Sequence, residues 1–203
     1  MNHLLIAFLY SISGFLMKFS DDEYDENSNK LIAVILGIFC GIAIAYLTSN
    51  NIDAAYIFFG ILIGNAIAFK IDGIHHIATL LTFLILFLIW GVFGPNGNVL
   101  SSFSIITLCI CMISALIDEW GNDNTGLYEK TRLLKVFFDY RFTMKIIIFI
   151  LAVLGLYQSL SGFYIAYVDF LSFSTFIFFI LFELFYEFAG FVFNKYLLLN
   201  DNC

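Results

Sequence analysis

Seven runs of mainly apolar residues, separated by short polar gaps, make up most of the chain. They cover about residues 4–17, 31–48, 54–69, 77–93, 99–117, 146–166 and 170–194. A helix needs about 20 residues to cross a hydrocarbon core of roughly 30 Å, and the tolerated range begins near 17. The pattern therefore predicts an all-α integral membrane protein with a bundle of about seven transmembrane helices. Residues 1–203 are expected to form a single polytopic transmembrane domain.

Composition points to the same class of protein. Of the 203 residues 62% are hydrophobic and 12% are charged, and a soluble domain of this length cannot bury so much apolar surface. The net charge of −7 argues against nucleic acid as a partner. We expect a multi-pass protein of the cell membrane that contacts membrane lipid and a small-molecule or lipid substrate. The sequence leaves its oligomeric state open, with a homo-oligomer and a complex subunit among the alternatives. The short first run also suits a secretory signal, but no Lys or Arg precedes it and Lys18 follows it.

All nine basic side chains lie in alternate gaps between the apolar runs or after the last run. They are Lys18, Lys30, Lys70, Lys130, Arg132, Lys135, Arg141, Lys145 and Lys195. Cytoplasmic loops of membrane proteins are enriched in Lys and Arg. Seven crossings, with the N-terminus outside and the C-terminus cytoplasmic, put every cation on one side. Removing any internal crossing breaks this pattern.

Most of the sixteen carboxylates lie on the same predicted side, although the positive-inside rule does not require it. The densest group follows the first run. If that helix continues, about 100° per residue puts Lys18, Asp22 and Asp25 on one face with Asp21 at its edge. Carboxylates gathered in this way suit Mg²⁺, which often bridges one or two of them to substrate phosphates. The alternative is a solvated acidic loop.

A second acidic group closes the fifth run. Asp118 and Asn122 are one helical turn apart, as are Glu119 and Asp123, so a continuous helix would offer paired oxygen ligands. Gly121 weakens the case for a continuous helix, and an ordinary helix end is the alternative.

The third group surrounds two histidines. Gly73 is expected to end the third helix, which leaves Lys70 at the interface and both His75 and His76 at the start of the fourth helix. Either histidine can exchange protons near neutral pH. Adjacent residues of a helix point in different directions, so we do not expect the pair to share a metal. No spacing of Cys and His resembles a zinc site.

Two further acids, Glu183 and Glu187, lie within the seventh run. An ionised acid deep in a membrane helix is disfavoured by about 2.5 to 3.5 kcal/mol on insertion scales. The two glutamates are one turn apart, about 6 Å along the axis, so they share a helix face. We expect this face to look into the bundle, toward a cation or a water-filled cavity. A structural pairing with Lys70 or Arg141 is the alternative.

The leading hypothesis is a membrane-embedded, Mg²⁺-dependent transferase or hydrolase that acts at the cytoplasmic interface on a phosphate- or diphosphate-bearing lipid or isoprenoid. Its predicted site residues fall into three roles. The metal ligands are Asp21, Asp22, Asp25, Asp118 and Asp123; the phosphate contacts are Lys18 and Lys70; the proton-transfer groups are Glu183, Glu187 and His76.

The Asp-Asp-x-x-Asp spelling of residues 21–25 resembles the aspartate-rich diphosphate motifs of intramembrane prenyltransferases over these five residues. The chain is shorter than those enzymes, and its motif follows the first helix rather than a later one. The rival hypothesis is a cation or proton-coupled transporter or channel that uses Glu183 and Glu187 as its ion site. That function needs polar groups toward the outer surface, where Asp53 and Asp169 are the only acids. A membrane subunit of a larger complex is the third reading.

Overall fold

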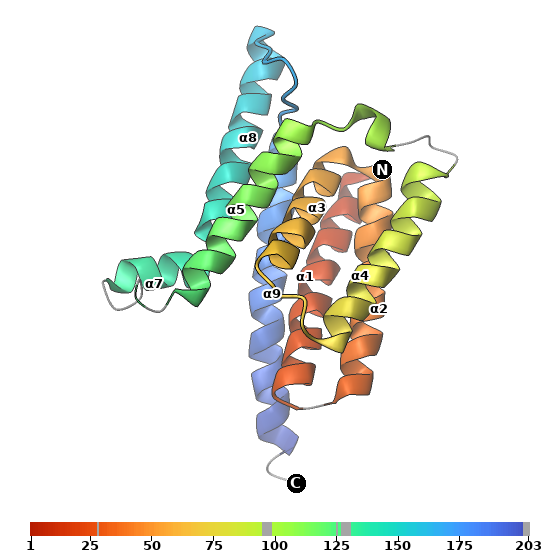
Figure 1. Ribbon diagram of the computed structural model, residues 1–203, viewed down its shortest axis with the longest axis vertical. Helices are drawn as coiled ribbons and strands as arrows, with labels where there is room; N and C mark the ends of the chain where they lie inside the picture. The colour runs from red at the N-terminus through yellow and green to blue at the C-terminus, as the bar shows by residue number, and fades with distance from the viewer. Residues whose placement is uncertain (28, 95–98, 125, 127–130, 201–203) are drawn as a thin grey trace. The chain divides into compact units, whose positions relative to one another are not determined.

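The computed structural model describes residues 1–27, 29–94, 99–124, 126 and 131–200, the last five without their side chains. Lys130, one of the predicted cytoplasmic cations, lies outside these residues. The α-helices are α1 (His3–Asp25), α2 (Lys30–Asn50), α3 (Ile52–Ile67), α4 (Ile74–Phe87), α5 (Ile105–Asp123), α7 (Arg132–Asp139), α8 (Phe142–Ser161) and α9 (Phe173–Asn200) (Figure 1). A π-helical turn, Leu88–Val92, continues α4, and a 3₁₀ turn, Val99–Ser102, precedes α5. No strand occurs in the described part of the chain.

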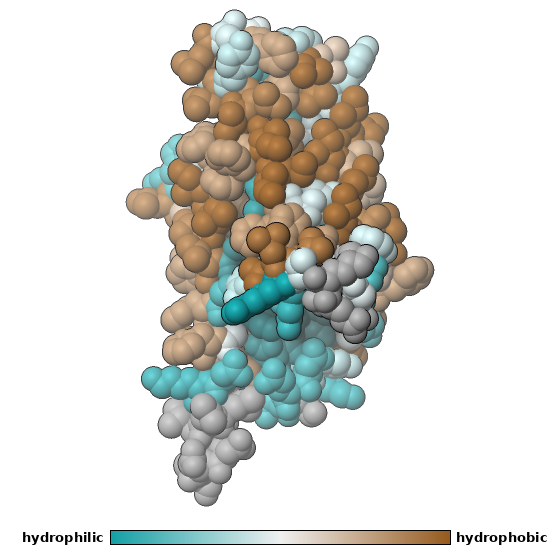
Figure 2. Space-filling model, turned by 90° about the vertical axis from the view of Figure 1, so that its left-hand side faces the viewer, coloured by the Kyte–Doolittle hydropathy of each residue, from teal (hydrophilic) through white to brown (hydrophobic). Residues whose placement is uncertain are grey.

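Within the described residues, six helical segments are long and apolar enough to cross a membrane. They are His3–Asp25, Lys30–Asn50, Ile74–Val92, Ile105–Asp123, Phe142–Ser161 and Phe173–Lys195. Helix α3 is also apolar but has only 16 residues. Hydrophobic side chains cover most of the face shown in Figure 2. The prediction of a helical, multi-pass membrane protein is therefore supported.

Several helix ends differ from those predicted. Helix α1 continues through the acidic group to Asp25, and α5 continues through Gly121 to Asp123. Helix α5 begins at Ile105 rather than near residue 99, because the side chain of Ser104 accepts a hydrogen bond from an amide of the first turn and caps the helix. The expectation that Gly73 ends the third helix is wrong: α3 ends at Ile67, and Gly73 is the N-cap residue of α4.

The chain folds into two compact units. Unit 1 comprises Met1–Asn51, Asp72–Ser101 and Phe178–Cys203, and so contains α1, α2, α4 and most of α9. Unit 2 comprises Ile52–Ile71 and Ser102–Ile177, and so contains α3, α5, α7 and α8.

In unit 1, helices α1 and α2 are antiparallel. Ser20 Oγ donates a hydrogen bond of 2.8 Å to the carbonyl oxygen of Ala33. Toward the other end of the pair, Cys40 Sγ lies 3.5 Å from the carbonyl oxygen of Ser13. The partner of the later α1 residue, Ser20, comes earlier in α2 than the partner of Ser13, so the two helices run in opposite directions.

Helices α2 and α4 are parallel and pack closely through glycines of α2. A Cβ at Gly37 would lie 2.8 Å from the carbonyl oxygen of His75, and one at Gly41 would lie 2.7 Å from that of Thr79. Only glycine permits so close an approach of the two backbones. These contacts place the first turn of α4 against α2.

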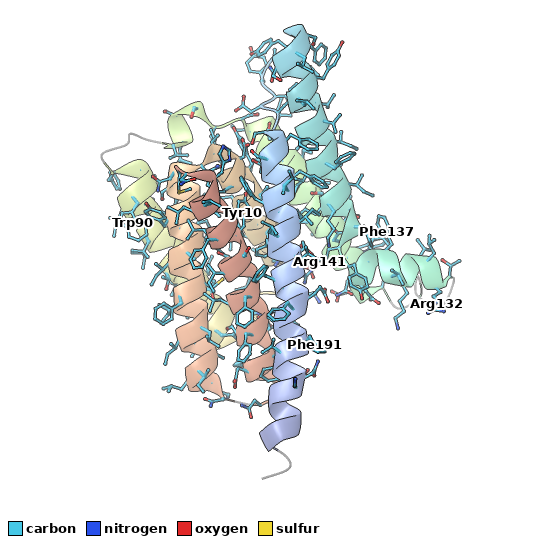
Figure 3. All side chains as sticks on the ribbon, turned by 180° about the vertical axis from the view of Figure 1, so that it is seen from behind. Tyr10, Trp90, Arg132, Phe137, Arg141 and Phe191 are labelled. Carbon is cyan, nitrogen blue, oxygen red and sulfur yellow. The ribbon has the colours of Figure 1, made fainter. Side chains whose placement is uncertain are left out.

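Helices α1 and α9 are also parallel. The ring of Tyr10, which is fully buried (Figure 3), stacks on Phe178 with centroids 6.0 Å apart. Farther along both helices, the ring of Phe19 meets Phe193 edge-on at 5.3 Å. Between these contacts, a Cβ at Gly14 would lie 2.1 Å from the carbonyl oxygen of Phe182.

This contact predicts that Gly14→Ala lowers the stability of unit 1 by several kcal/mol. The added methyl group meets the backbone of α9, which cannot move aside as a side chain can, and overpacking of this kind typically costs about 1 to 3 kcal/mol or more. The matched control is Gly190→Ala on α9, where the new Cβ would lie 3.2 Å from Cε of the flexible Lys18 side chain. Thermal melting of the two purified variants should show a much lower midpoint for Gly14→Ala. Equal midpoints would contradict the close contact.

In unit 2, α3 and α5 are parallel and meet through small residues. A Cβ at Gly60 would lie 2.7 Å from Cβ of Cys111, and one at Gly64 would lie 2.9 Å from Cβ of Ala115. The two glycines are four residues apart, as are their partners. This is the small-residue packing that lets membrane helices approach closely.

Asp53 and Tyr56 in the first turns of α3 hold the segment that precedes α9. Tyr56 Oη donates to Asp169 Oδ2 at 2.5 Å. Asp53 Oδ2 accepts hydrogen bonds from the Ser172 amide at 2.8 Å and from Thr175 Oγ1 at 2.7 Å. Asp53 and Asp169 therefore have structural partners within this unit.

Candidate metal centre

The ten predicted site residues divide between the two units. Unit 1 holds Lys18, Asp21, Asp22, Asp25, His76, Glu183 and Glu187, whereas unit 2 holds Lys70, Asp118 and Asp123.

In unit 1, a carboxylate from α1 and two imidazoles from α4 form a compact group, the Asp21–His75–His76 cluster. Asp21 Oδ1 lies 3.2 Å from His75 Nε2 and 3.7 Å from His76 Nδ1. One potential ligand atom from each residue lies within 4.8 Å of the other two. Three side chains at this separation can bind a single metal ion.

The expectation that the adjacent histidines diverge is wrong. Their ring centroids are only 3.9 Å apart. Two side chains that leave a helix about 100° apart can still converge on one group when that group lies between their directions. Asp21 lies in this position. Sequence reasoning therefore included Asp21 and His76 among the site residues but missed His75.

Packing against neighbouring helices holds His75 in place. Gly37 of α2 allows the first turn of α4 to approach, and Thr79 Oγ1 donates to the carbonyl oxygen of His75 at 2.9 Å. The ring of Tyr24 on α1 lies 4.4 Å from the His75 ring, centroid to centroid. The Ser20 hydrogen bond to α2 fixes this part of α1 in turn. The cluster is thus held between α1 and α4, with α2 supporting both.

The cluster is buried on one side and accessible on the other. His75 is 3% exposed, and its Nδ1 is buried with no hydrogen-bond partner among the described residues. The side chains of Asp21 and His76 are 21% and 32% exposed. Water or a substrate can therefore approach from the side of these two residues. Three protein ligands with an accessible remaining position are typical of catalytic metal sites.

The donor atoms indicate the class of metal. Imidazole nitrogens suit Zn²⁺ and other transition metals, whereas Mg²⁺ prefers oxygen ligands. Two imidazoles and one carboxylate are a known ligand set of catalytic Zn²⁺ sites. The two nitrogens thus favour a borderline metal such as Zn²⁺ over the Mg²⁺ expected from the acids.

Lys18 and Asp22 form a pair beside the cluster. Lys18 Nζ lies 2.8 Å from Asp22 Oδ1 and 5.7 Å from the ring centroid of Tyr186 on α9. Gly190 provides room for the lysine stem. Helix α1 continues through these residues, which is the condition under which the sequence puts Lys18, Asp22 and Asp25 on one face. Asp22 is thus paired with the lysine, and Asp25 is exposed.

The two intramembrane glutamates lie beside the surface of α9 that packs against α1. That surface includes Phe182 and Tyr186, and each glutamate follows one of these residues, about 100° farther around the helix. Glu183 is half-buried, whereas Glu187 is exposed. Their predicted roles in proton or ion transfer stay predictions.

In unit 2, the predicted metal ligands have other partners. Asp118 Oδ1 accepts from the Thr143 amide at 3.0 Å, and its Oδ2 accepts from the Met144 amide at 2.8 Å. The two oxygens therefore accept from first-turn amides of α8 that have no acceptor within the helix and that an N-cap side chain normally satisfies. Asp123 Oδ1 lies 2.5 Å from Lys70 Nζ. A metal at either carboxylate would have to replace these contacts.

No protein-family model matches this chain, and no curated protein or solved structure matches it either.

Proposed function

We propose that the protein crosses the cell membrane seven times, with its N-terminus outside and its C-terminus in the cytoplasm. The parallel packing of α2 and α4 supports a crossing by α3. Because α4 begins at the level where α2 begins, the chain that leaves the end of α2 must first return across that distance. The 16 residues of α3 span about 24 Å, and residues 68–73 add the remaining length.

Two further observations support this topology. Parallel packing of α1 and α9 requires an odd number of crossings from the first helix to the last, which six would not satisfy. The cations agree: Lys30 begins α2, Lys70 follows α3, Arg132 lies between α5 and α8, and Lys195 is near the end of α9. Seven crossings bring all of them to one side, which the positive-inside rule assigns to the cytoplasm.

Within this topology, we propose that the protein is a metal-dependent hydrolase or transferase acting on a lipid or isoprenoid that carries a phosphate or diphosphate. The observation that carries this proposal is the Asp21–His75–His76 cluster, with Lys18 one turn before Asp21 on the same helix. The metal would bind a phosphate oxygen, and the lysine would balance the remaining negative charge. The apolar tail would stay among the membrane helices.

The proposed chemistry follows from these two elements. In hydrolysis, a metal held by Asp21, His75 and His76 would supply an activated water molecule as the nucleophile for phosphorus. The bond from phosphorus to the leaving oxygen breaks with its electron pair, and that oxygen takes up a proton. In transfer, a hydroxyl group of a second substrate replaces the water. Glu183 is the predicted proton acceptor. The proposed ion is a borderline metal such as Zn²⁺. Mg²⁺ is the alternative, and the experiment below compares the two.

Turnover by the purified protein in nanodiscs tests this proposal. After chelation, Zn²⁺, Mn²⁺ or Mg²⁺ is added singly with phosphatidic acid or farnesyl diphosphate as substrate, and phosphate release and lipid products are measured. We expect turnover only with metal, and none in Asp21→Asn. The Lys18→Gln/Asp22→Asn double variant should raise KM by about 10- to 100-fold, as expected for loss of a charged hydrogen bond of about 1.5 to 3 kcal/mol.

Two controls accompany this measurement. Asp22→Asn alone retains the lysine and should keep a KM near that of the unchanged protein. Asp25→Asn removes an exposed carboxylate of the same helix and should keep full turnover. Metal binding without any metal-dependent turnover of these substrates would contradict the proposed reaction.

A further inference from the structure

The short helix α7 runs crosswise to α5 and α8 within unit 2 (Figure 1). Helix α5 ends at Asp123 and α8 begins at Phe142. The hydrogen bonds of Asp118 join the last turns of α5 to the first turn of α8, so these two apolar helices are antiparallel. Helix α7 therefore lies at the end of two candidate membrane spans, at the level where a membrane meets water.

One side of α7 packs against its own unit. Phe138 is 9% exposed and contacts α5 at Gly121, where an added Cβ would lie 2.1 Å from Cδ1 of the phenylalanine. Leu134, one turn earlier, is half-buried. Phe137 lies beside the start of α8 (Figure 3) and stacks on Phe142 at 5.7 Å. These contacts hold the helix in its crosswise orientation.

A second side of α7 is apolar but uncovered. Leu133 is 76% exposed and Val136 is 43% exposed. At 100° per residue these two side chains lie about 60° apart on the helix, away from the side that carries Phe138. A large aliphatic side chain so exposed at the end of a membrane span indicates contact with acyl chains rather than with water.

The third side of α7 is charged. Arg132, Lys135 and Asp139 lie within about 60° of one another around the helix. Both cations are exposed, and neither has an ion-pair partner in the part of the chain that the structure describes. The cations that follow the helix differ, since Arg141 pairs with Glu119 at 3.1 Å and Lys145 donates to the backbone of Tyr140.

We propose that α7 is an interfacial helix that binds anionic lipid headgroups. Leu133 and Val136 enter the acyl region, and Arg132 and Lys135 contact the lipid phosphates just above it. A helix with a basic face and an apolar face typically lies in the plane of the interface in this way. Each cation near an anionic membrane surface strengthens binding about fivefold, so the pair contributes roughly 30-fold. This inference concerns unit 2 alone and does not depend on the metal centre.

Lipid binding to the intact protein tests the charged face. Native mass spectrometry compares adducts of phosphatidylglycerol and phosphatidylcholine with matched tails. The preference for phosphatidylglycerol should fall by roughly 30-fold in the Arg132→Gln/Lys135→Gln variant. The matched control, Lys195→Gln, removes an exposed cation of α9 and should leave the preference unchanged. An equal preference in the double variant and the unchanged protein would overturn the assignment.

Spin labels test the depth of the apolar face. In nanodiscs, with the native cysteines replaced by alanine, nitroxides at Leu133→Cys and Val136→Cys should be relaxed more by oxygen than by a water-soluble nickel chelate. A nitroxide at Asp139→Cys should show the reverse. Relaxation mainly by nickel at Leu133→Cys would overturn the proposal, as would dipolar broadening there, which would indicate a second copy of the chain on this face. If the cysteine-free variant fails to fold, the lipid measurement, which needs no cysteine replacement, tests the proposal by itself.

Discussion

Asp118→Ala should destabilise the protein by about 2 to 4 kcal/mol, since loss of a helix cap costs about 1 kcal/mol and the buried amide of Met144, left without a partner, costs about 1 to 3 kcal/mol. Asp118 is 1% exposed, and its two oxygens accept hydrogen bonds from the amides of Thr143 and Met144. Alanine removes both acceptors at once. The change is measured as the shift in the midpoint of thermal or denaturant unfolding of the purified protein.

Asp123→Ala is the matched control, because Asp123 is on the same helix but exposed, and its ion-pair partner is the partly exposed Lys70. Surface ion pairs of this kind are worth about 0 to 1 kcal/mol. Asp118→Asn should fall between the two alanine variants, since its amide oxygen can replace one of the two acceptors. Equal losses for Asp118→Ala and Asp123→Ala would contradict the capping role.

Zn²⁺ should stabilise the unchanged protein strongly, and Asp21→Asn should abolish that effect. A ligand that binds only the folded state adds about 2.7 kcal/mol at a concentration 100 times its Kd. The Asp21 carboxylate lies within 3.7 Å of a nitrogen of each imidazole and is the only anionic ligand of the cluster. Its loss leaves two neutral nitrogens, which bind far more weakly. The measurement is the difference in melting temperature with and without ZnCl₂, which cancels any effect of the substitution on the metal-free protein.

Two variants control for metal bound elsewhere. Asp25→Asn changes an exposed carboxylate one turn beyond Asp21, and His3→Asn removes the histidine at the other end of α1. Both should retain the full Zn²⁺ effect, whereas His76→Asn should lose most of it. A Zn²⁺ effect that survives in both Asp21→Asn and His76→Asn would exclude the cluster as the site. Because this experiment measures binding alone, it can succeed even if the proposed lipid reaction fails.

Apolar runs located the membrane helices well but not their ends. The first run stops at residue 17, yet α1 continues to Asp25. Hydrophobicity reports contact with lipid or a core, whereas a helix can continue wherever its polar side chains find partners, as Lys18 and Asp22 do one turn apart. The start of α5 was misplaced for the opposite reason. The first residues of the fifth apolar run are apolar enough to be counted with the helix, but they form the 3₁₀ turn Val99–Ser102, which precedes the Ser104 cap.

The cluster could be predicted only in part. The alternation of charges indicated that the end of the first helix and the start of the fourth lie on one side of the membrane, which already brings Asp21 near the histidine pair. His75 was not predicted as a site residue, because its position next to His76 gives only the directions of the two side chains around an ideal helix. It does not show where the Asp21 carboxylate lies. The capping role of Asp118 was hidden for a similar reason, since its amide partners belong to a different helix.

Helix pairing was beyond the sequence altogether. Glycines occur in most of the apolar runs, and nothing in their spacing tells which helix Gly14 or Gly37 contacts. The structure pairs the first with α9 and the second with α4. Such contacts depend on the complementary shapes of two helix surfaces, and the sequence of one helix does not show which other helix has the matching surface.

The pairing of α1 with α9 has a consequence for biosynthesis. Helix α1 is translated before every helix of unit 2, whereas Phe182 and Gly190, which pack against Gly14 and Lys18, are translated after all of them. While unit 2 is being synthesised, the side of α1 that packs against α9 therefore faces lipid or the insertion machinery, with a lysine that lacks its α9 contacts. Unit 1 is completed only after α3, α5, α7 and α8 of unit 2 have been synthesised.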